Sequence, residues 1–134
     1  MKRSEARDKA VKVLYQTYIF DDLKLDYDLN LLIDELSSSD NSFIEELVFG
    51  VRKNKEKLEK LANKYLDNWT IDRLSKVDQA ILSLAIYEIL YTEVPNLVAI
   101  DEAIELAKGY SDEKVIKMIN ACLDKILHNE VNDE

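Results

Sequence analysis

The stretch SKVDQAILSLAIYEILY, residues 75–91, decides the fold of this sequence. Its apolar residues recur every three or four positions, which is the spacing of one face of a helix. That face is wide and consists of Val77, Ala80, Ile81, Leu84, Ala85 and Ile89. Ser75 stands before the run, in the position where a serine hydroxyl caps a helix. Because so broad an apolar face needs cover on several sides, we expect this segment to be the central, most buried helix.

Helical spacing continues on both sides of this segment, and the sequence has little of the turn chemistry that a sheet needs. Two glycines and one proline occur in 134 residues, and no Asn-Gly or Asp-Gly pair separates alternating runs. The spacing predicts further helices at about 3–20, 27–37, 42–68, 97–109 and from 113 onward, with a single turn at 70–74. The fold class is therefore all-α, with six to seven helices packed as small bundles.

Local signals indicate where several of these helices begin, bend or end. Ser42 and Glu45 have the spacing of a capping box, so a helix should begin there. Gly50 either bends that helix or lets another helix come close to it. Gly109 stands where a glycine commonly ends a helix.

The length and composition are those of a single soluble domain, which we place at 1–128, followed by a polar, acidic tail at 129–134 that frays. Hydrophobic residues make up 47% and charged residues 34% of the chain. The longest uncharged apolar run, ILSLAIY (81–87), is far shorter than the ~20 residues of a membrane-spanning helix. No apolar segment follows the basic N-terminus, so no signal peptide is expected. The single cysteine, Cys122, excludes an internal disulfide and fits a reduced, cytoplasmic setting.

Positive charge is confined to two segments of a chain whose net charge is −9. Residues 1–12 carry five basic and two acidic side chains, among them Arg3 and Arg7, one helical turn apart. Guanidinium groups near a tyrosine, here Tyr15, are typical of single-stranded RNA binding, although arginines on such a helix also serve solubility. The second segment carries lysines along one helix flank, which is either a solvated face or a phosphate contact: Lys53, Lys57, Lys60 and Lys64.

Residues suited to catalysis or metal binding do not form a recognisable motif. The single histidine, His128, lies in the tail, and Cys122 falls on an apolar stripe with no histidine near it in sequence. Asp101 and Glu105 form a carboxylate pair at helical spacing, which a solvated helix face explains. Glycine-rich phosphate loops and zinc-binding helix motifs do not occur. We therefore expect no enzymatic activity, no metal and no cofactor.

Three longer motifs make the sequence similar to the NusB family. They are WTIDRLSKVDQAILSLAIYEILY (69–91), VPNLVAIDEAIELAKGYSDEK (94–114) and KMINACLDKI (117–126). The family begins with a basic stretch that leads into A-R-x-x-A-x-x-x-L-Y-Q, matched here by Ala6, Arg7, Ala10, Leu14, Tyr15 and Gln16. The resemblance thus covers nearly the whole chain, with the motifs in the family's order.

The resemblance implies two small helical bundles packed together and a role without catalysis. NusB-like proteins pair with the small ribosomal subunit protein NusE and bind the boxA element of single-stranded nascent RNA. The complex joins RNA polymerase and other Nus factors and suppresses termination, notably during ribosomal RNA transcription. A cytoplasmic transcription antitermination factor without membrane attachment is therefore implied, and the free protein is expected to be either a monomer or a homodimer.

The resemblance also implies a set of RNA-binding residues, which are Lys2, Arg3, Arg7, Tyr15, Asp78, Lys117 and Met118. Asp78 is expected to accept hydrogen bonds from base edges, and Met118 stands where the family has a phenylalanine. Other departures lower the positive charge near this surface or change its packing: Ser4, Glu5, Ser83, Asp101 and Ala121. We therefore expect weak RNA binding by this chain alone and tighter binding together with NusE.

Two competing hypotheses follow from the same residues. The first is an interaction module of the same fold that binds only proteins. The small number of arginines in residues 1–12 and the net charge of −9 support it. The helical domain also resembles the N-terminal part of some RNA cytosine methyltransferases, which carry a further α/β domain with glycine-rich loops. Because no such domain appears before Glu134, methyl transfer is not expected.

Overall fold

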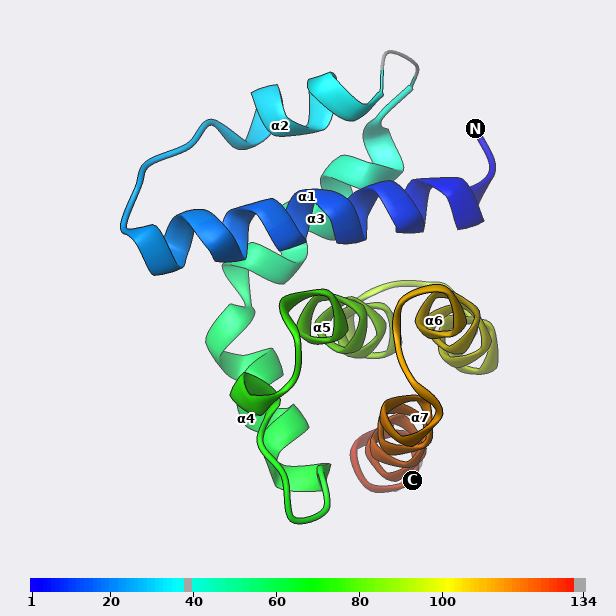
Figure 1. Ribbon diagram of the computed structural model, residues 1–134. Coiled ribbons are helices and arrows are strands. Elements are labelled where there is room, and N and C mark those ends of the chain that lie inside the picture. Colours follow the sequence, from blue (N-terminus) through cyan, green and yellow to red (C-terminus); the bar gives the residue numbers. More distant parts are fainter. Residues whose placement is uncertain (38–39, 132–134) are drawn as a thin grey trace.

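The computed structural model describes residues 1–37 and 40–131, and all regular structure among them is helical (Figure 1). The α-helices are α1 (Arg3–Leu23), α2 (Leu29–Leu36), α3 (Ser42–Lys53), α4 (Lys55–Tyr65), α5 (Lys76–Tyr91), α6 (Asn96–Tyr110) and α7 (Glu113–Ile126). A 3-10 turn lies at Ile71–Arg73, and a π-helical turn continues α7 over Leu127–Val131. The predicted all-α fold is confirmed.

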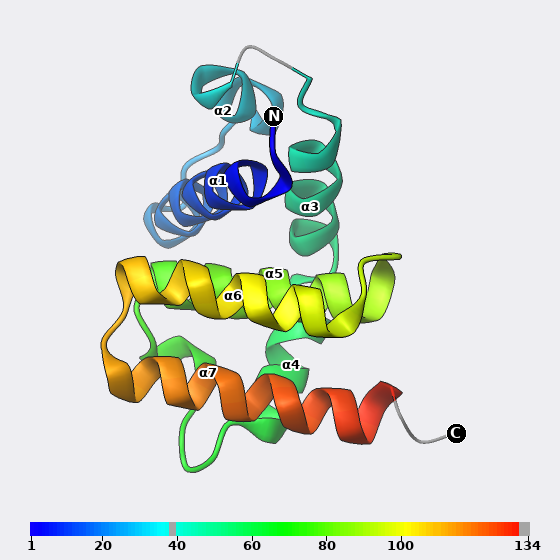
Figure 2. The same ribbon diagram turned by 90° about the vertical axis from the view of Figure 1, so that its right-hand side faces the viewer.

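Helix α5 lies at the centre of the molecule, with one group of helices, α1–α3, above it and a second group beside and below it, in which α6 runs beside α5 and α4 and α7 lie below (Figures 1 and 2). It contacts α1, α3, α4, α6 and α7. Because neighbours surround it, residues outside its apolar face, such as Ser83 and Glu88, are buried as well. The prediction that 75–91 contains the central, most buried helix is confirmed.

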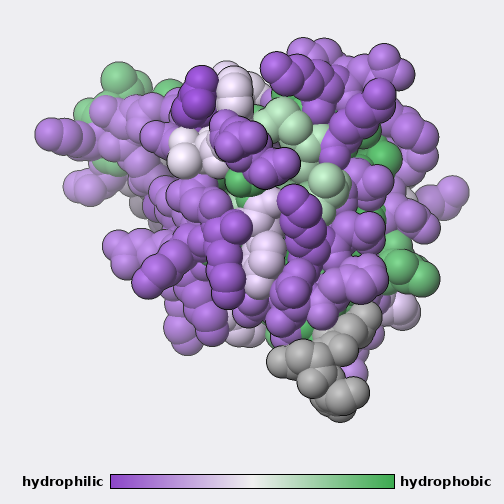
Figure 3. Space-filling model, turned by 90° about the horizontal axis from the view of Figure 1, so that it is seen from below, coloured by the Kyte–Doolittle hydropathy of each residue, from purple (hydrophilic) through white to green (hydrophobic). Residues whose placement is uncertain are grey.

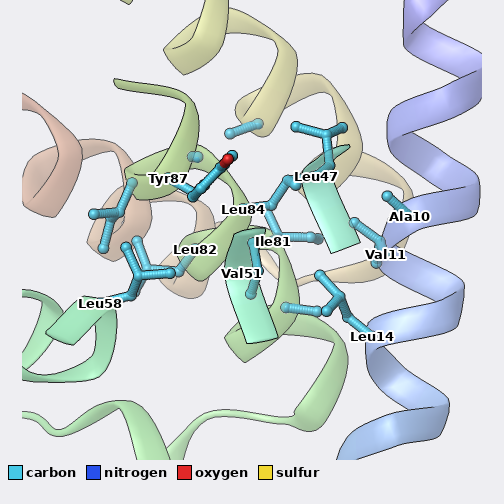
Figure 4. Close-up of a cluster of buried hydrophobic side chains, with 14 of the residues drawn as sticks. Ala10, Val11, Leu14, Leu47, Val51, Leu58, Ile81, Leu82, Leu84 and Tyr87 are labelled. Carbon is cyan, nitrogen blue, oxygen red and sulfur yellow. The ribbon is translucent and has the colours of Figure 1, made fainter. Parts of the chain in front are cut away.

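The hydrophobic core runs continuously through both groups of helices. Figure 4 shows side chains of α1, α3 and α4 that meet those of α5: Ala10, Val11, Leu14, Leu47, Val51, Leu58, Ile81, Leu82 and Leu84. Burying one leucine, isoleucine or valine side chain contributes about 1.5–3 kcal/mol. This shared core therefore fixes the position of α1 relative to α5 and α6, on which the candidate site depends.

Side-chain caps define the start of two helices near the candidate site. Ser75 Oγ accepts a hydrogen bond from the backbone N–H of Asp78 at 3.1 Å, as expected from its place before the apolar run. Asp112 Oδ1 accepts one from the backbone N–H of Val115 at 2.9 Å. A capping side chain of this kind contributes about 0.5–2 kcal/mol, so both helix starts are well defined.

The expected capping box at Ser42 is wrong, although α3 does begin at this residue. Ser42 is already helical, and its backbone N–H donates to Asp40 Oδ1 at 3.0 Å. The carboxylate two residues earlier satisfies the first free N–H group of the helix, so the Ser42 hydroxyl is not needed as a cap.

Two further boundaries differ from the sequence prediction. The single helix expected over 42–68 is divided, because Asn54 leaves the helical conformation and its side-chain amide donates to the backbone oxygen of Gly50 at 2.8 Å. Gly50 instead allows close approach, since the Tyr87 ring occupies the space that a Cβ atom would need. Gly109 does not end α6, which continues to Tyr110 without a residue of positive φ at its end.

The boundary expected between the domain and its tail falls inside the π-helical turn Leu127–Val131. Glu130 in this turn accepts hydrogen bonds from Lys64 Nζ at 3.3 Å and from the Tyr65 hydroxyl. These contacts hold the turn against α4. The remainder of the expected tail, 132–134, lies outside the described residues.

Candidate nucleic-acid interface

The basic head of the sequence forms the first turns of α1, at one end of the molecule (Figure 1). Lys2 and Arg3 are exposed, and the Arg3 guanidinium carbon lies 4.3 Å from the centroid of the Phe43 ring at the start of α3. This cation–π contact contributes about 0.5–1 kcal/mol and restrains the Arg3 side chain at the surface. Two of the predicted phosphate-binding residues are therefore accessible and adjacent.

Arg7, in contrast, is buried, with 3% of its surface exposed. Its Nε and Nη2 atoms donate to the two carboxylate oxygens of Glu88 on α5, at 2.7 and 2.9 Å. Its Nη1 atom lies 3.6 Å from Oε1 of Glu102 on α6. The expected RNA contact of Arg7 needs an accessible guanidinium, but this one neutralises Glu88, which is itself 1% exposed and, as a buried carboxylate, requires a cationic partner. Arg7 thus joins α1 to α5 and α6 and is not open to a phosphate.

Tyr15 lies on the solvent side of α1 and is 39% exposed. It lines a shallow pocket of about 220 Å³ together with Lys12, Val77 and Tyr110. Tyr110, at the end of α6, is 44% exposed, and its hydroxyl donates to Asp8 Oδ1 at 2.7 Å. Two tyrosine rings beside a lysine therefore face solvent where α1, α5 and α6 meet, which suits base stacking with a neighbouring phosphate.

The contact between Asp8 and Tyr110 shifts the pKa values of both side chains. Burial and the hydrogen bond to Asp8 raise the pKa of Tyr110 to about 12. Burial acts to raise the pKa of Asp8, but the hydrogen bond from Tyr110 and the Lys12 ammonium at 3.0 Å outweigh it, so that this pKa is lowered. At neutral pH Tyr110 is therefore protonated and Asp8 is charged, and their hydrogen bond holds the Tyr110 ring beside α1.

Asp78 lies near this pocket, but only 5% of its surface is exposed. Its carboxylate accepts hydrogen bonds from the Ser75 hydroxyl at 2.9 Å and from the Ser111 hydroxyl. The expected contact with base edges needs an accessible carboxylate, and this one is buried and satisfied by two serines. Because Ser111 directly follows Tyr110, Asp78 instead ties the start of α5 to the segment that carries Tyr110.

Lys117 and Met118 form a second patch on α7. They line a pocket of about 500 Å³ between α4 and α7, together with Tyr65 and Lys114. Helices α4 and α7 belong to the lower side of the molecule, and that side, seen directly in Figure 3, has a small hydrophobic area among mainly hydrophilic side chains. Helix α6 lies between α1 and α7 (Figure 2), so the structure separates this patch from Lys2 and Arg3.

Tyr110 and Lys114 belong to these surfaces but are absent from the residues predicted from sequence. Tyr110 is an aromatic residue at the end of α6, next to the loop before α7. An aromatic residue at such a helix end is the feature of the sequence that could have marked Tyr110 as a site residue. Lys114 lies one helical turn before Lys117, and its Nζ atom is 5.5 Å from the centroid of the Trp69 ring. The Arg73 guanidinium lies 3.8 Å from the same ring, so Trp69 contacts cations from two segments.

Cys122 is buried, and burial raises the pKa of its thiol to about 12, so that the thiol is protonated and weakly reactive at neutral pH. Within 1–37 and 40–131, no three histidine, cysteine, aspartate or glutamate residues are grouped as metal ligands would be. Over the same ranges, the helices are too short or too polar to traverse a lipid bilayer.

The fold defines a small, all-helical protein, and Tyr15 and Tyr110 beside Lys12 make the surface where α1, α5 and α6 meet a candidate nucleic-acid interface. Residues 4–128 match the model of the NusB family, and the chain belongs to this family. Transcription antitermination protein NusB of Listeria monocytogenes serotype 4a is 46% identical over 128 residues, which cover 94% of this chain and 96% of that protein.

Solved structures of the family have the same fold. NusB of T. maritima matches with a TM-score of 0.85 and 32% identity, over 96% of this chain and 92% of that one. A structure of the antitermination factors NusB and NusE in complex with dsRNA matches with a TM-score of 0.76 and 25% identity, over 96% of this chain and 98% of that one. The predicted family resemblance is therefore confirmed along nearly the whole chain.

Proposed function

We propose that this protein is a non-catalytic transcription antitermination factor that binds boxA-type single-stranded RNA together with NusE. Membership of the NusB family supports this function, and a relative of the same fold has been solved with NusE and dsRNA. The observation that carries RNA binding for this chain is the exposed pair Tyr15 and Tyr110 beside Lys12. Two ring faces next to an ammonium group provide stacking and phosphate contact in one place.

The proposed RNA-binding surface runs along α1 and partly around it, because positions 3 and 15 differ by about 120° around a helix. Arg3 and Tyr15 are twelve residues apart, which corresponds to about 18 Å along a helix. A single-stranded segment that stacks on Tyr15 and Tyr110 therefore extends along α1 until its phosphates reach Arg3 and Lys2. Phosphate contacts of this kind set the position of the RNA and the salt dependence of binding, whereas the stacked bases contribute a further 1–3 kcal/mol each, roughly.

Arg7 and Asp78 act in this proposal as positioning residues. Arg7 fixes the first turns of α1 against α5 and α6, and Asp78 fixes the segment with Tyr110 against the start of α5. The RNA surface is assembled from three helices, so these buried contacts set the distance between its two tyrosines.

A protein partner supplies the rest of the affinity. The net charge of −9 opposes the approach of phosphates, and few cations lie on the RNA-facing side of this chain. NusE shares the RNA in this proposal, Lys117 and Met118 of α7 add a second contact region, and the assembly joins RNA polymerase with other Nus factors. Such an assembly works on nascent RNA in the cytoplasm.

Titrations with a boxA RNA and a scrambled RNA, with and without NusE, test this function. Tyr15→Ala should weaken boxA binding about tenfold, because one stacked base is lost. Phe49→Ala is the matched control, since Phe49 is an aromatic residue exposed to a similar extent (44%) but lies on α3. If about three cations contact phosphates, log K should fall with log[salt] with a slope of roughly −2.

Three results of these titrations would contradict the proposal. Equal affinity for the scrambled RNA would remove sequence specificity. No binding even with NusE would favour the alternative, a protein-only module of the same fold. If Tyr15→Ala binds boxA RNA with unchanged affinity, the RNA-binding surface does not include the two tyrosines.

A further inference from the structure

A groove of about 700 Å³ lies between α4, the end of α5 and the π-helical turn, away from Tyr15 of α1 and Tyr110 of α6. Its sides are formed by three lysines, one glutamate and three apolar residues: Lys57, Lys60, Lys64, Glu130, Leu61, Leu90 and Tyr91. We call it the lysine groove. We propose that the lysine groove docks an acidic protein segment that carries apolar side chains. This inference does not depend on the proposed RNA surface.

Charge complementarity is the first argument for an acidic occupant. Lys57, Lys60 and Lys64 are spaced at three and four residues on α4, which places them in one stripe about 10 Å long. Lys57 and Lys60 are exposed and form no ion pair with any described residue. On a chain of net charge −9, this stripe is an isolated positive feature that attracts carboxylates.

Glu130 shows how a carboxylate binds at one end of the groove. It accepts hydrogen bonds from Lys64 Nζ at 3.3 Å and from the Tyr65 hydroxyl. These two donors lower the pKa of Glu130. The chain thus already places one acidic side chain on the lysine stripe, and the two remaining lysines offer the same kind of partner to an incoming segment.

The apolar residues that line the lysine groove favour a protein segment over RNA as its occupant. Leu61 and Leu90 are aliphatic and only partly buried, so they favour apolar side chains, whereas bases stack on aromatic faces. Tyr91 is the one aromatic residue among the residues that line the groove. Its ring lies 5.3 Å from Lys57 Nζ and 5.4 Å from the Tyr87 ring. An amphipathic helix with leucines at i, i+3, i+4 and i+7 and acidic neighbours fits both features.

Titration of isotope-labelled protein with a synthetic peptide, followed by amide NMR shifts, tests the proposal. The peptide has glutamates around leucines at helical spacing, and two further peptides replace either its glutamates by glutamines or its leucines by alanines. We expect saturable shifts at Leu61, Leu90 and Tyr91 with the first peptide and at least about fivefold weaker binding of the other two. No saturable shift at millimolar peptide would overturn the proposal, as would equal binding of all three peptides.

Variants of the lysine groove test the residues individually. Lys60→Glu should weaken peptide binding about fivefold, whereas the same charge reversal at Lys108, which is also exposed but lies on α6, should not. Tyr91→Ala should also weaken it, while Leu97→Ala, which removes another exposed apolar side chain, should not. Glu130→Gln should tighten binding about twofold, because the internal competitor for Lys64 is lost. Equal effects of Lys60→Glu and Lys108→Glu would show attraction by overall charge alone and overturn the docking site.

An oligouridine titration separates the two macromolecule classes. RNA that shifts the same amides and competes with the acidic peptide would overturn the assignment to a protein segment. Shifts confined to the α1 surface, near Tyr15 and Tyr110, would instead support separate sites for RNA and protein.

Discussion

The Arg7 guanidinium holds three helices together through one buried ion pair and a second, longer contact. Its two hydrogen bonds to Glu88 connect residues 81 positions apart in the sequence, and Glu102 adds a carboxylate at 3.6 Å. A pair of this kind contributes little by comparison with an apolar pair of equal size, but removing one partner leaves an uncompensated buried charge. The consequence of a single substitution is therefore large.

Arg7→Ala should lower the free energy of unfolding by about 3–5 kcal/mol, because Glu88 remains buried without its cation. Urea unfolding followed by circular dichroism measures this loss. Arg3→Ala is the control, since Arg3 is exposed and its contact with Phe43 is worth less than about 1 kcal/mol. A loss below about 1 kcal/mol in Arg7→Ala would show that Glu88 finds another partner, and the positioning role of Arg7 would then be wrong.

The contact between α3 and α5 depends on the absence of a side chain at Gly50. The Tyr87 ring fills the space that a Cβ atom would occupy there, whereas Gly109 in α6 has no atom within 4 Å of such a Cβ. Alanine is about 1 kcal/mol better than glycine inside a helix. Substitution of alanine at Gly50 therefore tests the close approach of two helices, and the same substitution at Gly109 tests helix propensity alone.

Gly109→Ala should stabilise the protein by about 0.5–1 kcal/mol through helix propensity. Gly50→Ala should destabilise it by about 1–3 kcal/mol, because the added methyl group displaces Tyr87 from the core. Urea unfolding of both variants measures the difference. In a Tyr87→Ala background the cost of Gly50→Ala should largely disappear, and a persistent cost would place its cause outside this contact.

At the scale of the elements, local signals predicted most helices but missed a break within one of them. The apolar face of 75–91 and the Ser75 cap are properties of adjacent residues, and both are confirmed. The break between α3 and α4 arises at Asn54, a residue that a helical pattern tolerates. Nothing in the spacing of leucines over 42–68 requires this break, because the pattern of apolar residues continues through it.

At the scale of the whole molecule, two buried groups and one partly exposed tyrosine bonded to a carboxylate make stability depend on alkaline pH. Burial raises the pKa of Tyr18, of Tyr110 and of Cys122 to about 12 each, from ordinary values of 10.0, 10.0 and 9.0. Between about pH 9 and 12 the unfolded chain therefore loses protons that the folded protein keeps. Stability is fully present below this range and falls as pH rises through it.

The urea midpoint should therefore decrease steadily from pH 8 to pH 11. Tyr18→Phe should flatten this decrease, since it removes one group whose pKa differs between the folded and unfolded states. Comparison of the two midpoint profiles provides the measurement. Parallel profiles for the two proteins would show that Tyr18 does not contribute to the alkaline loss.

The candidate site was only partly predictable from the sequence. Lys2, Arg3 and Tyr15 lie on the surface as their helical positions indicate. Tyr110 meets Tyr15 across 95 residues only because the end of α6 comes to lie beside α1, and no local pattern contains that contact. Asp78 is acidic and next to a cap, but its burial depends on Ser111 in a later loop.

The sequence by itself determined that this protein is all-helical, that 75–91 is central and that the chain is similar to the NusB family. These properties depend on residue order and on contacts within one or two helical turns. The tertiary structure alone decided that Arg7 faces Glu88, that Asp78 faces serines and that two tyrosines share one pocket. A charged side chain on a helix has no fixed partner until packing brings another helix within hydrogen-bond reach, and burial then selects the partner that neutralises or satisfies it.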